Sequence, residues 1–130
     1  MSDAPRRPTM ALTSVTVGAP DAPALAGFYG RLLDWPVVAE EADWAQVRPP
    51  DGVAGPTVNV EHEAHWRAPV WPSEPGAQHA TMHLDIRVDD LDVAEAWATS
   101  LGARRDAVQP QPDVVVMRDP VGHPFCFFLD

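Results

Sequence analysis

Apolar and polar residues follow the same order twice along this chain. Apolar residues alternate with polar or small residues over positions 14–20 and again over positions 83–89, as expected for half-buried strands. Each alternating run ends at an aspartate, and the residues that follow have the spacing of an amphipathic helix. The matched positions are Asp21 and Asp90, Phe28 and Trp97, and Leu32 and Leu101. The chain therefore contains an internal repeat of roughly 65–70 residues, which predicts two copies of one structural unit.

Each copy predicts a strand, a helix and three further strands. The aspartate at the end of the first run is a good helix N-cap, Pro23 suits a first helical turn, and Gly102 suits a helix C-terminus. Strands are predicted at 11–18, 36–40, 43–48, 56–63, 82–88, 104–108, 113–118 and 124–129, with a helix after Asp21 and another after Asp90. The predicted fold class is α+β, with two tandem βαβββ modules forming a curved eight-stranded mixed sheet around a central cleft.

The predicted domain organisation is one domain preceded by a tail. Residues 1–10 are polar and contain proline and arginine, which predicts a flexible N-terminal tail. Residues 11–130 form the domain, with module one at 11–63, a linker at 64–81 and module two at 82–130. The linker is rich in proline and aromatic residues without periodicity, so we expect it to pass over the groove between the modules.

Composition excludes several classes of partner. The net charge is −10 and all nine basic residues are arginine, which argues against nucleic acid and anionic membrane surfaces as partners. No apolar run approaches the roughly 18–20 residues of a membrane-spanning helix. The single cysteine, Cys126, rules out an internal disulfide and favours a reducing, cytoplasmic location.

Several spaced motifs in residues 11–129 resemble the vicinal oxygen chelate superfamily, which includes glyoxalases, bleomycin-resistance proteins and extradiol dioxygenases. The motifs are FYGRLLDW at 28–35, HLDIRVDDLD at 83–92 and RDPVGHPFCFF at 118–128. The pair Trp71-Pro72 before His83, together with the segment from Asp119 to Cys126, is similar to the glyoxalase-like branch common in actinobacteria. This resemblance implies the fold, whereas the superfamily hosts many reactions on one scaffold.

The resemblance also implies four positions for a divalent metal, one in the first and one in the last strand of each module. In this sequence they fall on Ser14, Glu61, His83 and Cys126. Only Glu61 and His83 are ordinary ligands there, and Cys126 stands among phenylalanines, which disfavour its thiolate form. We therefore expect no conventional metal site. If a metal is bound, the resemblance implies Zn, Fe, Mn, Ni or Co held by Glu61 and His83, with Cys126 as a further candidate.

Aromatic residues predict the lining of a binding site. Trp44, Trp66 and Trp71 exceed what a small core needs, and the last two lie in the linker, where they either line a pocket or fasten the linker to the sheet. Ser14 and Cys126 are further candidates for ligand contact. Aromatic walls in an acidic protein favour a neutral or cationic organic ligand. By contrast, Trp97 and Tyr29 are expected at helix–sheet interfaces, and His123 in a turn.

Three functions remain open at this point, and the sequence does not decide whether the protein is an enzyme. The first is a metal-free protein that binds a small aromatic or cationic molecule, as bleomycin-resistance proteins do. The second is a metal-dependent lyase, isomerase or dioxygenase that uses Glu61 and His83. The third is a metal-free enzyme in which Glu61 and His83 act as acid and base on an enolisable carbonyl. The resemblance further implies a homodimer that covers exposed strand edges.

Overall fold

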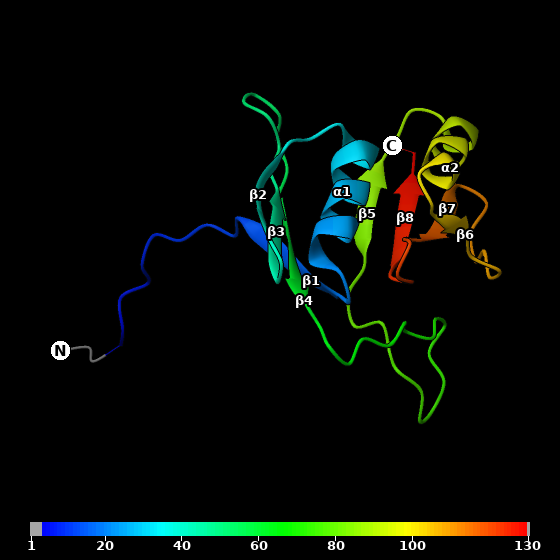
Figure 1. Cartoon of the computed structure of the whole chain (residues 1–130), viewed down its shortest axis with the longest axis horizontal. Coiled ribbons are helices and arrows are strands. Elements are labelled where there is room, and N and C mark those ends of the chain that lie inside the picture. The colour runs from blue at the N-terminus through cyan, green and yellow to red at the C-terminus, as the bar shows by residue number, and fades with distance from the viewer. Residues whose placement is uncertain (1–3, 130) are drawn as a thin grey trace.

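The computed structural model describes residues 4–129. The first three residues of the predicted tail, 1–3, and the last residue of predicted module two, 130, lie outside the described residues. Residues 4–13 contain no helix or strand, and they extend away from the rest of the chain (Figure 1). From Ser14 onward, the strands and helices follow the order β-α-β-β-β twice.

Module one contains β1 (Ser14–Ala19), α1 (Ala22–Leu33), β2 (Val37–Glu41), β3 (Trp44–Val47) and β4 (Thr57–His62). Its four strands form one sheet in the order β1-β4-β3-β2. The first and last strands, β1 and β4, pair in parallel, while the other neighbours are antiparallel. The helix thus provides the crossover that a parallel pair requires.

Module two contains β5 (Leu84–Arg87), α2 (Leu91–Ser100), β6 (Arg104–Arg105), β7 (Val114–Arg118) and β8 (Pro124–Phe128). Its strand order, β5-β8-β7-β6, repeats that of module one, again with a parallel first and last strand. The predicted α+β class and the two tandem modules are confirmed. The eight strands are hydrogen-bonded as two sheets of four.

The repeated aspartate caps both helices. The Asp21 side chain accepts a hydrogen bond from the Ala24 amide at 3.1 Å, and Asp90 accepts from the Val93 amide at 3.0 Å. These bonds satisfy amides that have no partner within the helix. The repeated aspartates in the sequence therefore mark the N-terminus of the helix in each module.

Helix α1 lies at the centre of the molecule and packs against both modules (Figure 1). Phe28 and Tyr29 on α1 are fully buried, and both rings contact Phe125 of β8 edge-on at centroid distances of 6.1 and 6.3 Å. The prediction that Trp97 packs between helix and sheet is wrong, since Trp97 is half exposed. Its indole N–H donates to the Leu32 carbonyl at 3.1 Å, so Trp97 connects α2 to α1 instead.

The hairpin between β7 and β8 joins the two modules. Asp119 is fully buried at its start and accepts a 2.6 Å hydrogen bond from the Tyr29 hydroxyl. Its other carboxylate oxygen accepts from three successive turn amides at 3.0 Å. Burial, reinforced by the charge of Asp119 and this hydrogen bond, raises the pKa of Tyr29 well above its ordinary value. Module two is therefore held to α1 by a buried polar contact as well as by aromatic packing.

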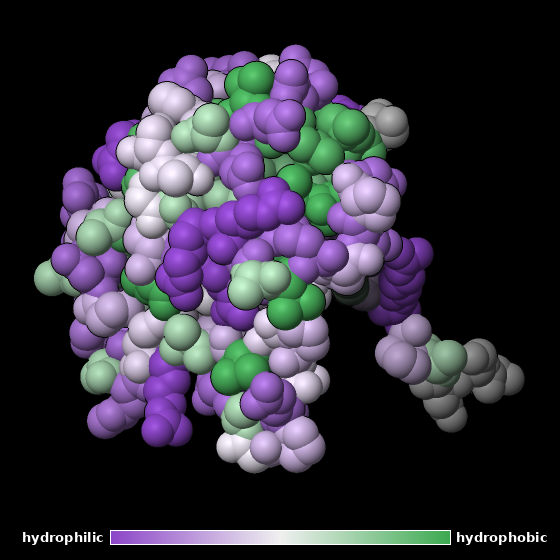
Figure 2. Space-filling model, turned by 90° about the vertical axis from the view of Figure 1, so that its right-hand side faces the viewer, coloured by the Kyte–Doolittle hydropathy of each residue, from purple (hydrophilic) through white to green (hydrophobic). Residues whose placement is uncertain are grey.

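The surface at the module-two end is predominantly hydrophilic, with hydrophobic residues scattered among polar ones (Figure 2). Trp97, Val93 and Val108 are among the exposed hydrophobic residues of the chain. Neither helix within residues 4–129 has the length and apolar character needed to span a bilayer.

Candidate functional site

An open hollow of about 880 Å³ lies over the sheet of module two, on the side opposite α2. Side chains of β5, β7 and β8 form its floor, the linker residue Trp71 contributes one wall, and residues 110–113 contribute another. The lining residues are Trp71, His83, Asp85, Pro110, Gln111, Asp113, Val114, Val116, Cys126, Phe128 and Leu129. All come from the linker and module two, whereas the sequence analysis expected the site between the modules. Two smaller spaces lie where the modules meet: one of about 50 Å³ beside Tyr29 and His83, and an open one of about 240 Å³ between β1, the linker and His123.

Three groups able to exchange protons or bind metal meet at one end of this hollow. His83 Nε2 lies 3.2 Å from Asp85 Oδ1, and Asp85 is paired in register with Cys126 on the neighbouring strand. The ligand atoms of His83, Asp85 and Cys126 all lie within 4.8 Å of one another. The cluster follows from strand geometry, because positions 83 and 85 are two apart and the parallel pairing brings position 126 beside them.

The environment of Cys126 keeps its thiol protonated at neutral pH. Cys126 is buried, with 6% of its surface exposed. Burial, and secondarily the negative charge of Asp85, raises the pKa of Cys126 from 9.0 to about 11. A thiol of this kind is a poor nucleophile, because the thiolate is the reactive form.

The rest of the hollow combines an aromatic wall, an apolar floor and acidic groups. The Trp71 and His83 rings lie 6.1 Å apart at 42°. Val114, Val116 and Phe128 supply apolar surface, and Asp85 and Asp113 supply carboxylates. No arginine is among the described residues that line it, so a cationic ligand would meet negative charge and an aromatic face.

Comparison with protein families assigns residues 14–128 to the glyoxalase-like domain. This chain belongs to the glyoxalase-like family. A search of curated proteins finds no match to the sequence. The match to the family model covers nearly all of both modules, so the family resemblance inferred from the motifs is confirmed.

Solved structures with the glyoxalase-like fold superpose over almost the whole chain. A glyoxalase/bleomycin resistance protein/dioxygenase family enzyme from Burkholderia phytofirmans PsJN has a TM-score of 0.68 at 15% identity, covering 92% of this chain and 98% of its own. A glyoxalase/bleomycin resistance protein from Albidiferax ferrireducens T118 has a TM-score of 0.63 at 20% identity, with 91% and 97% covered. Lactoylglutathione lyase from Agrobacterium tumefaciens has a TM-score of 0.60 at 17% identity, with 95% and 96% covered. At these identities the likeness establishes the fold alone.

The register of this glyoxalase-like chain places Asn59, rather than Glu61, at the module-one position equivalent to Cys126. Thr16 pairs with Asn59 as Asp85 pairs with Cys126, and Thr16 and Asp85 each precede the capping aspartate by five residues. The Asn59 amide is buried and accepts a 2.9 Å hydrogen bond from Gln46. Glu61 is exposed one same-face position further along, opposite Gly18.

The other predicted site residues divide between the hollow and the linker attachment. Trp71, His83 and Cys126 line the hollow together, whereas Ser14, Glu61, Trp44 and Trp66 do not. Trp66 instead donates from its indole N–H to the Val121 carbonyl at 2.9 Å and packs on His123 at 4.3 Å. It therefore fastens the linker to the hairpin of module two. His123 occupies the turn as expected, with Nε2 2.7 Å from the Gly18 carbonyl oxygen.

Asp85 and the wall at 110–113 were missed by the sequence reasoning. Asp85 could have been found, because it shares a strand face with His83. The wall could not, since residues 106–113 have no periodicity and their position depends on contacts with distant residues.

Proposed function

We propose that this glyoxalase-like protein binds a small planar aromatic cation in the hollow over module two, without the conventional metal of the superfamily. The single observation that carries the proposal is the composition of the hollow, which combines the Trp71 ring, an apolar floor and two carboxylates without arginine. A cation over an indole face is stabilised by the negative face of the ring, and more strongly where water is displaced. The net charge of −10 also increases the local concentration of cations.

The chemistry of the four family positions supports the metal-free part of the proposal. The resemblance implies Ser14, His83 and Cys126 for three of them, and Asn59 occupies the module-one position equivalent to Cys126 in the strand pairing. Ser14 and Asn59 are neutral and the Asn59 amide is already hydrogen-bonded. Burial raises the pKa of Cys126 to about 11, which disfavours the thiolate that a metal would bind. The resemblance implies a usual set of His or Gln, Glu, His and Glu, and a single imidazole beside a hydroxyl, an amide and a thiol does not fit it.

Three tricyclic probes that differ in charge test the proposed ligand class. Proflavine is cationic, acridine is neutral at pH 8, and anthracene-9-carboxylate is anionic. We expect proflavine to bind most tightly by isothermal titration calorimetry and the anion least tightly. Trp71→Ala should weaken proflavine binding roughly 3- to 10-fold, because it removes the aromatic face. Asp85→Asn should weaken it by roughly 2- to 5-fold, since Asp85 is partly exposed and its charge is screened.

The variants decide the test, because the net charge alone attracts any cation. Trp97→Ala is the matched control, since Trp97 is a half-exposed tryptophan that does not line the hollow. It should leave the dissociation constant for proflavine within about twofold of the wild-type value. Equal weakening by both tryptophan variants, or equal affinity for all three probes, would contradict the proposal.

The cluster of His83, Asp85 and Cys126 supports a second candidate, a metal-dependent lyase, isomerase or dioxygenase. An imidazole, a carboxylate and a thiol within 4.8 Å could hold Zn or a related ion such as Fe, Mn, Ni or Co. A bound divalent ion would polarise paired oxygens of a substrate. The same hollow contains His83 but not Glu61, so the geometry favours a site built on His83 and Asp85 over one built on His83 and Glu61.

Elemental analysis of untagged protein separates the two candidates. The first candidate predicts no stoichiometric transition metal and no thermal stabilisation by added Zn, Mn, Ni, Co or Fe. Stoichiometric metal that is lost in His83→Ala and in Asp85→Ala would establish the second candidate and overturn the metal-free proposal. His65→Ala is a suitable control, because His65 is exposed and lies outside the hollow.

We also propose that the protein forms a homodimer in the cytoplasm. The edge strand β2 has one unpaired side and exposes Val37 and Val38, which are 38% and 45% accessible. An exposed apolar edge is a site for pairing with a second copy. Sedimentation velocity should give a dimer, and Val38→Lys should shift it toward a monomer. A wild-type monomer at high micromolar concentration would contradict this.

A further inference from the structure

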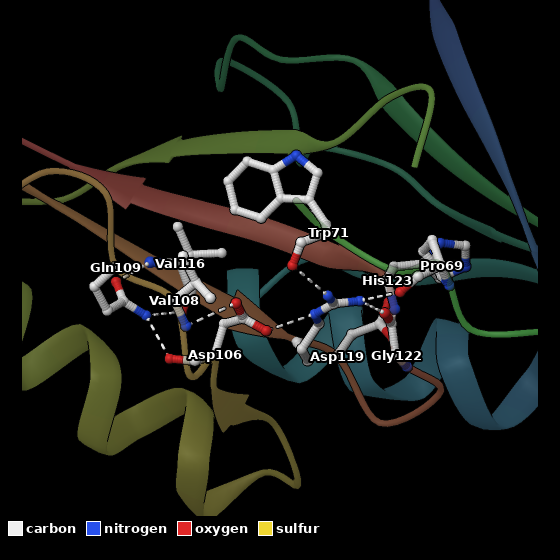
Figure 3. Close-up of polar contacts among 10 residues, drawn as sticks. Pro69, Trp71, Asp106, Val108, Gln109, Val116, Asp119, Gly122 and His123 are labelled. Carbon is white, nitrogen blue, oxygen red and sulfur yellow. Dashed lines mark hydrogen bonds and ion pairs between the residues drawn. The ribbon is translucent and has the colours of Figure 1, made fainter. Parts of the chain in front are cut away.

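Arg118 is a buried arginine at the end of β7, and all three nitrogens of its guanidinium donate hydrogen bonds. Its Nε donates to Asp106 Oδ1 at 2.9 Å, and both side chains are nearly inaccessible, at 8% and 12% exposure. One Nη donates to the carbonyls of Pro69 and Gly122 at 2.7 and 2.8 Å, and the other donates to the Trp71 carbonyl at 3.3 Å. Figure 3 shows these bonds converging from the linker, the hairpin and the loop after β6.

The bond to Asp106 fixes the loop that forms one wall of the hollow. The second carboxylate oxygen of Asp106 accepts from the Val108 amide at 3.2 Å. The Gln109 side chain then bonds the Asp106 carbonyl and both backbone groups of Val116 at 2.8–2.9 Å. Residues 110–113 follow directly, and Pro110, Gln111 and Asp113 line the hollow. The position of this wall therefore depends on Asp106.

The bonds to Pro69 and Trp71 fix the wall to which Trp71 belongs. Both accept through backbone carbonyls, so they hold the chain on either side of Val70 and leave the Trp71 ring free to contact a ligand. In Figure 3 the Trp71 ring stands over β8, while its carbonyl points toward the hydrogen-bond network. One guanidinium thus connects two segments that are far apart in sequence and that each contribute a wall of the hollow.

We propose that Arg118 is a positioning residue that sets the separation of these two walls and thereby the affinity for the aromatic cation. The inference rests on the proposed function for its ligand and on the hydrogen-bond network for its mechanism. A planar guanidinium with fixed donor directions can serve a carboxylate and three carbonyls at once, whereas a lysine ammonium lacks this geometry. Holding both walls before the ligand arrives removes an ordering cost from binding.

Arg118→Lys tests the inference because it keeps the positive charge and removes the planar set of N–H donors of the guanidinium. We expect proflavine binding to weaken roughly 3- to 10-fold, the same range that we expect for Trp71→Ala. In a Trp71→Ala background the same substitution should change the affinity by less than about twofold, because no aromatic ring remains to be positioned. The matched control is Arg105→Lys, since Arg105 pairs with Glu95 on an exposed part of the surface.

Hydrogen exchange provides a readout that needs no ligand. In Arg118→Lys, amides in 66–79 and 106–113 should exchange faster, while amides of β1 and β4 keep wild-type rates. Uniformly faster exchange would show that Arg118 only stabilises the fold, and it would overturn the inference. If Arg118→Lys does not fold, Asp106→Asn replaces it, since that variant keeps the shape and the three carbonyl contacts of Arg118 but removes the ion pair.

The two readouts separate failure of the inference from failure of the proposed function. If the wild type binds none of the three probes, the proposed function fails, and local loosening of 66–79 would still support Arg118 as the residue that holds the walls. If the wild type binds proflavine but Arg118→Lys weakens it equally with and without Trp71, Arg118 does not act through the Trp71 wall and the inference fails.

Discussion

The two modules have the same strand order, yet their helices are buried to very different extents. Helix α1 buries seven of its residues, whereas α2 buries only Ala98. The difference arises because α1 packs on its own sheet and also contacts β8 of module two through Phe28 and Tyr29. Helix α2 packs only on its own sheet and touches α1 through Trp97. Equivalent positions in the two modules therefore contribute unequally to the free energy of unfolding.

The open faces of the two sheets differ in a complementary way. In module one, Gln46 and Asn59 bond to each other across neighbouring strands, which leaves a polar and already satisfied surface. In module two the equivalent positions are Val116 and Cys126, beside Asp85. Apolar surface next to an ionisable group is a better binding site than a surface whose polar groups are paired. Module one therefore contributes mainly to the core, while module two lines the hollow that we propose as the binding site.

The largest expected effect compares the repeat-equivalent aromatics of α1 and α2. Phe28→Ala should lower the free energy of unfolding by about 3–5 kcal/mol, because the ring is 1% exposed and its loss leaves a cavity between the modules. Trp97→Ala should cost only about 1–2 kcal/mol, because Trp97 is 50% exposed and loses one hydrogen bond. Chemical denaturation of both variants measures the difference.

If Phe28→Ala and Trp97→Ala lower the free energy of unfolding equally, α1 and α2 contribute equally to stability, which would contradict the inference from the deeper burial of α1. Leu101→Ala extends the comparison along α2, since Leu101 is the repeat counterpart of buried Leu32 and is itself only partly buried. It should cost less than Leu32→Ala by the same argument.

A smaller effect is expected at the glycines of the two loops that precede the last strands. Gly122 has a φ of 103°, and a Cβ there would lie 2.6 Å from the Ala68 Cβ of the linker. Gly122→Ala should therefore destabilise the fold by about 2–4 kcal/mol through backbone strain and overlap. Gly52, between β3 and β4, has a φ of 82° but open space around it, so Gly52→Ala should cost only about 1–2 kcal/mol. Thermal unfolding of the two variants gives the order, and a larger loss at Gly52 would show that linker contact at the hairpin is unimportant.

The fold was predictable because its signals are local. Alternation of apolar residues and the capping aspartates placed both helices and all eight strands within a few residues. Packing between the modules was not predictable in this way. Trp97 has the same spacing as Phe28, and only the position of α1 between the two sheets determines which ring is buried.

The site was predictable in part for a related reason. His83, Cys126 and Glu61 were all implied by the family motifs, whereas the strand pairing makes Asn59, two residues before Glu61, the equivalent of Cys126. Register is fixed by pairing across the chain, so a shift of two residues keeps the strand pattern and changes the site. Arg118 contacts Pro69, which lies 49 positions earlier in the chain, and a local sequence pattern cannot predict such a contact.

The smallest expected effect concerns the ionisation of Cys126, the position at which the two sheet faces differ most. The pKa of Cys126 is raised from 9.0 to about 11, mainly by burial and secondarily by Asp85. Between pH 9 and 11 the thiol ionises in the unfolded chain but not in the folded protein. The stability that the neutral thiol contributes is therefore fully present below pH 9 and is lost as the pH rises toward 11. Because the chain has one cysteine, the rate of iodoacetamide alkylation against pH, followed by mass spectrometry, reports this group alone.

Asp85→Asn should lower the midpoint of the alkylation rate against pH by less than about one pH unit, since burial is the larger cause of the raised pKa. Asp113→Asn, which removes a second carboxylate from the same hollow, should leave the midpoint in place. If both variants lower the midpoint equally, the general negative charge of the hollow, rather than the strand neighbour Asp85, controls the thiol.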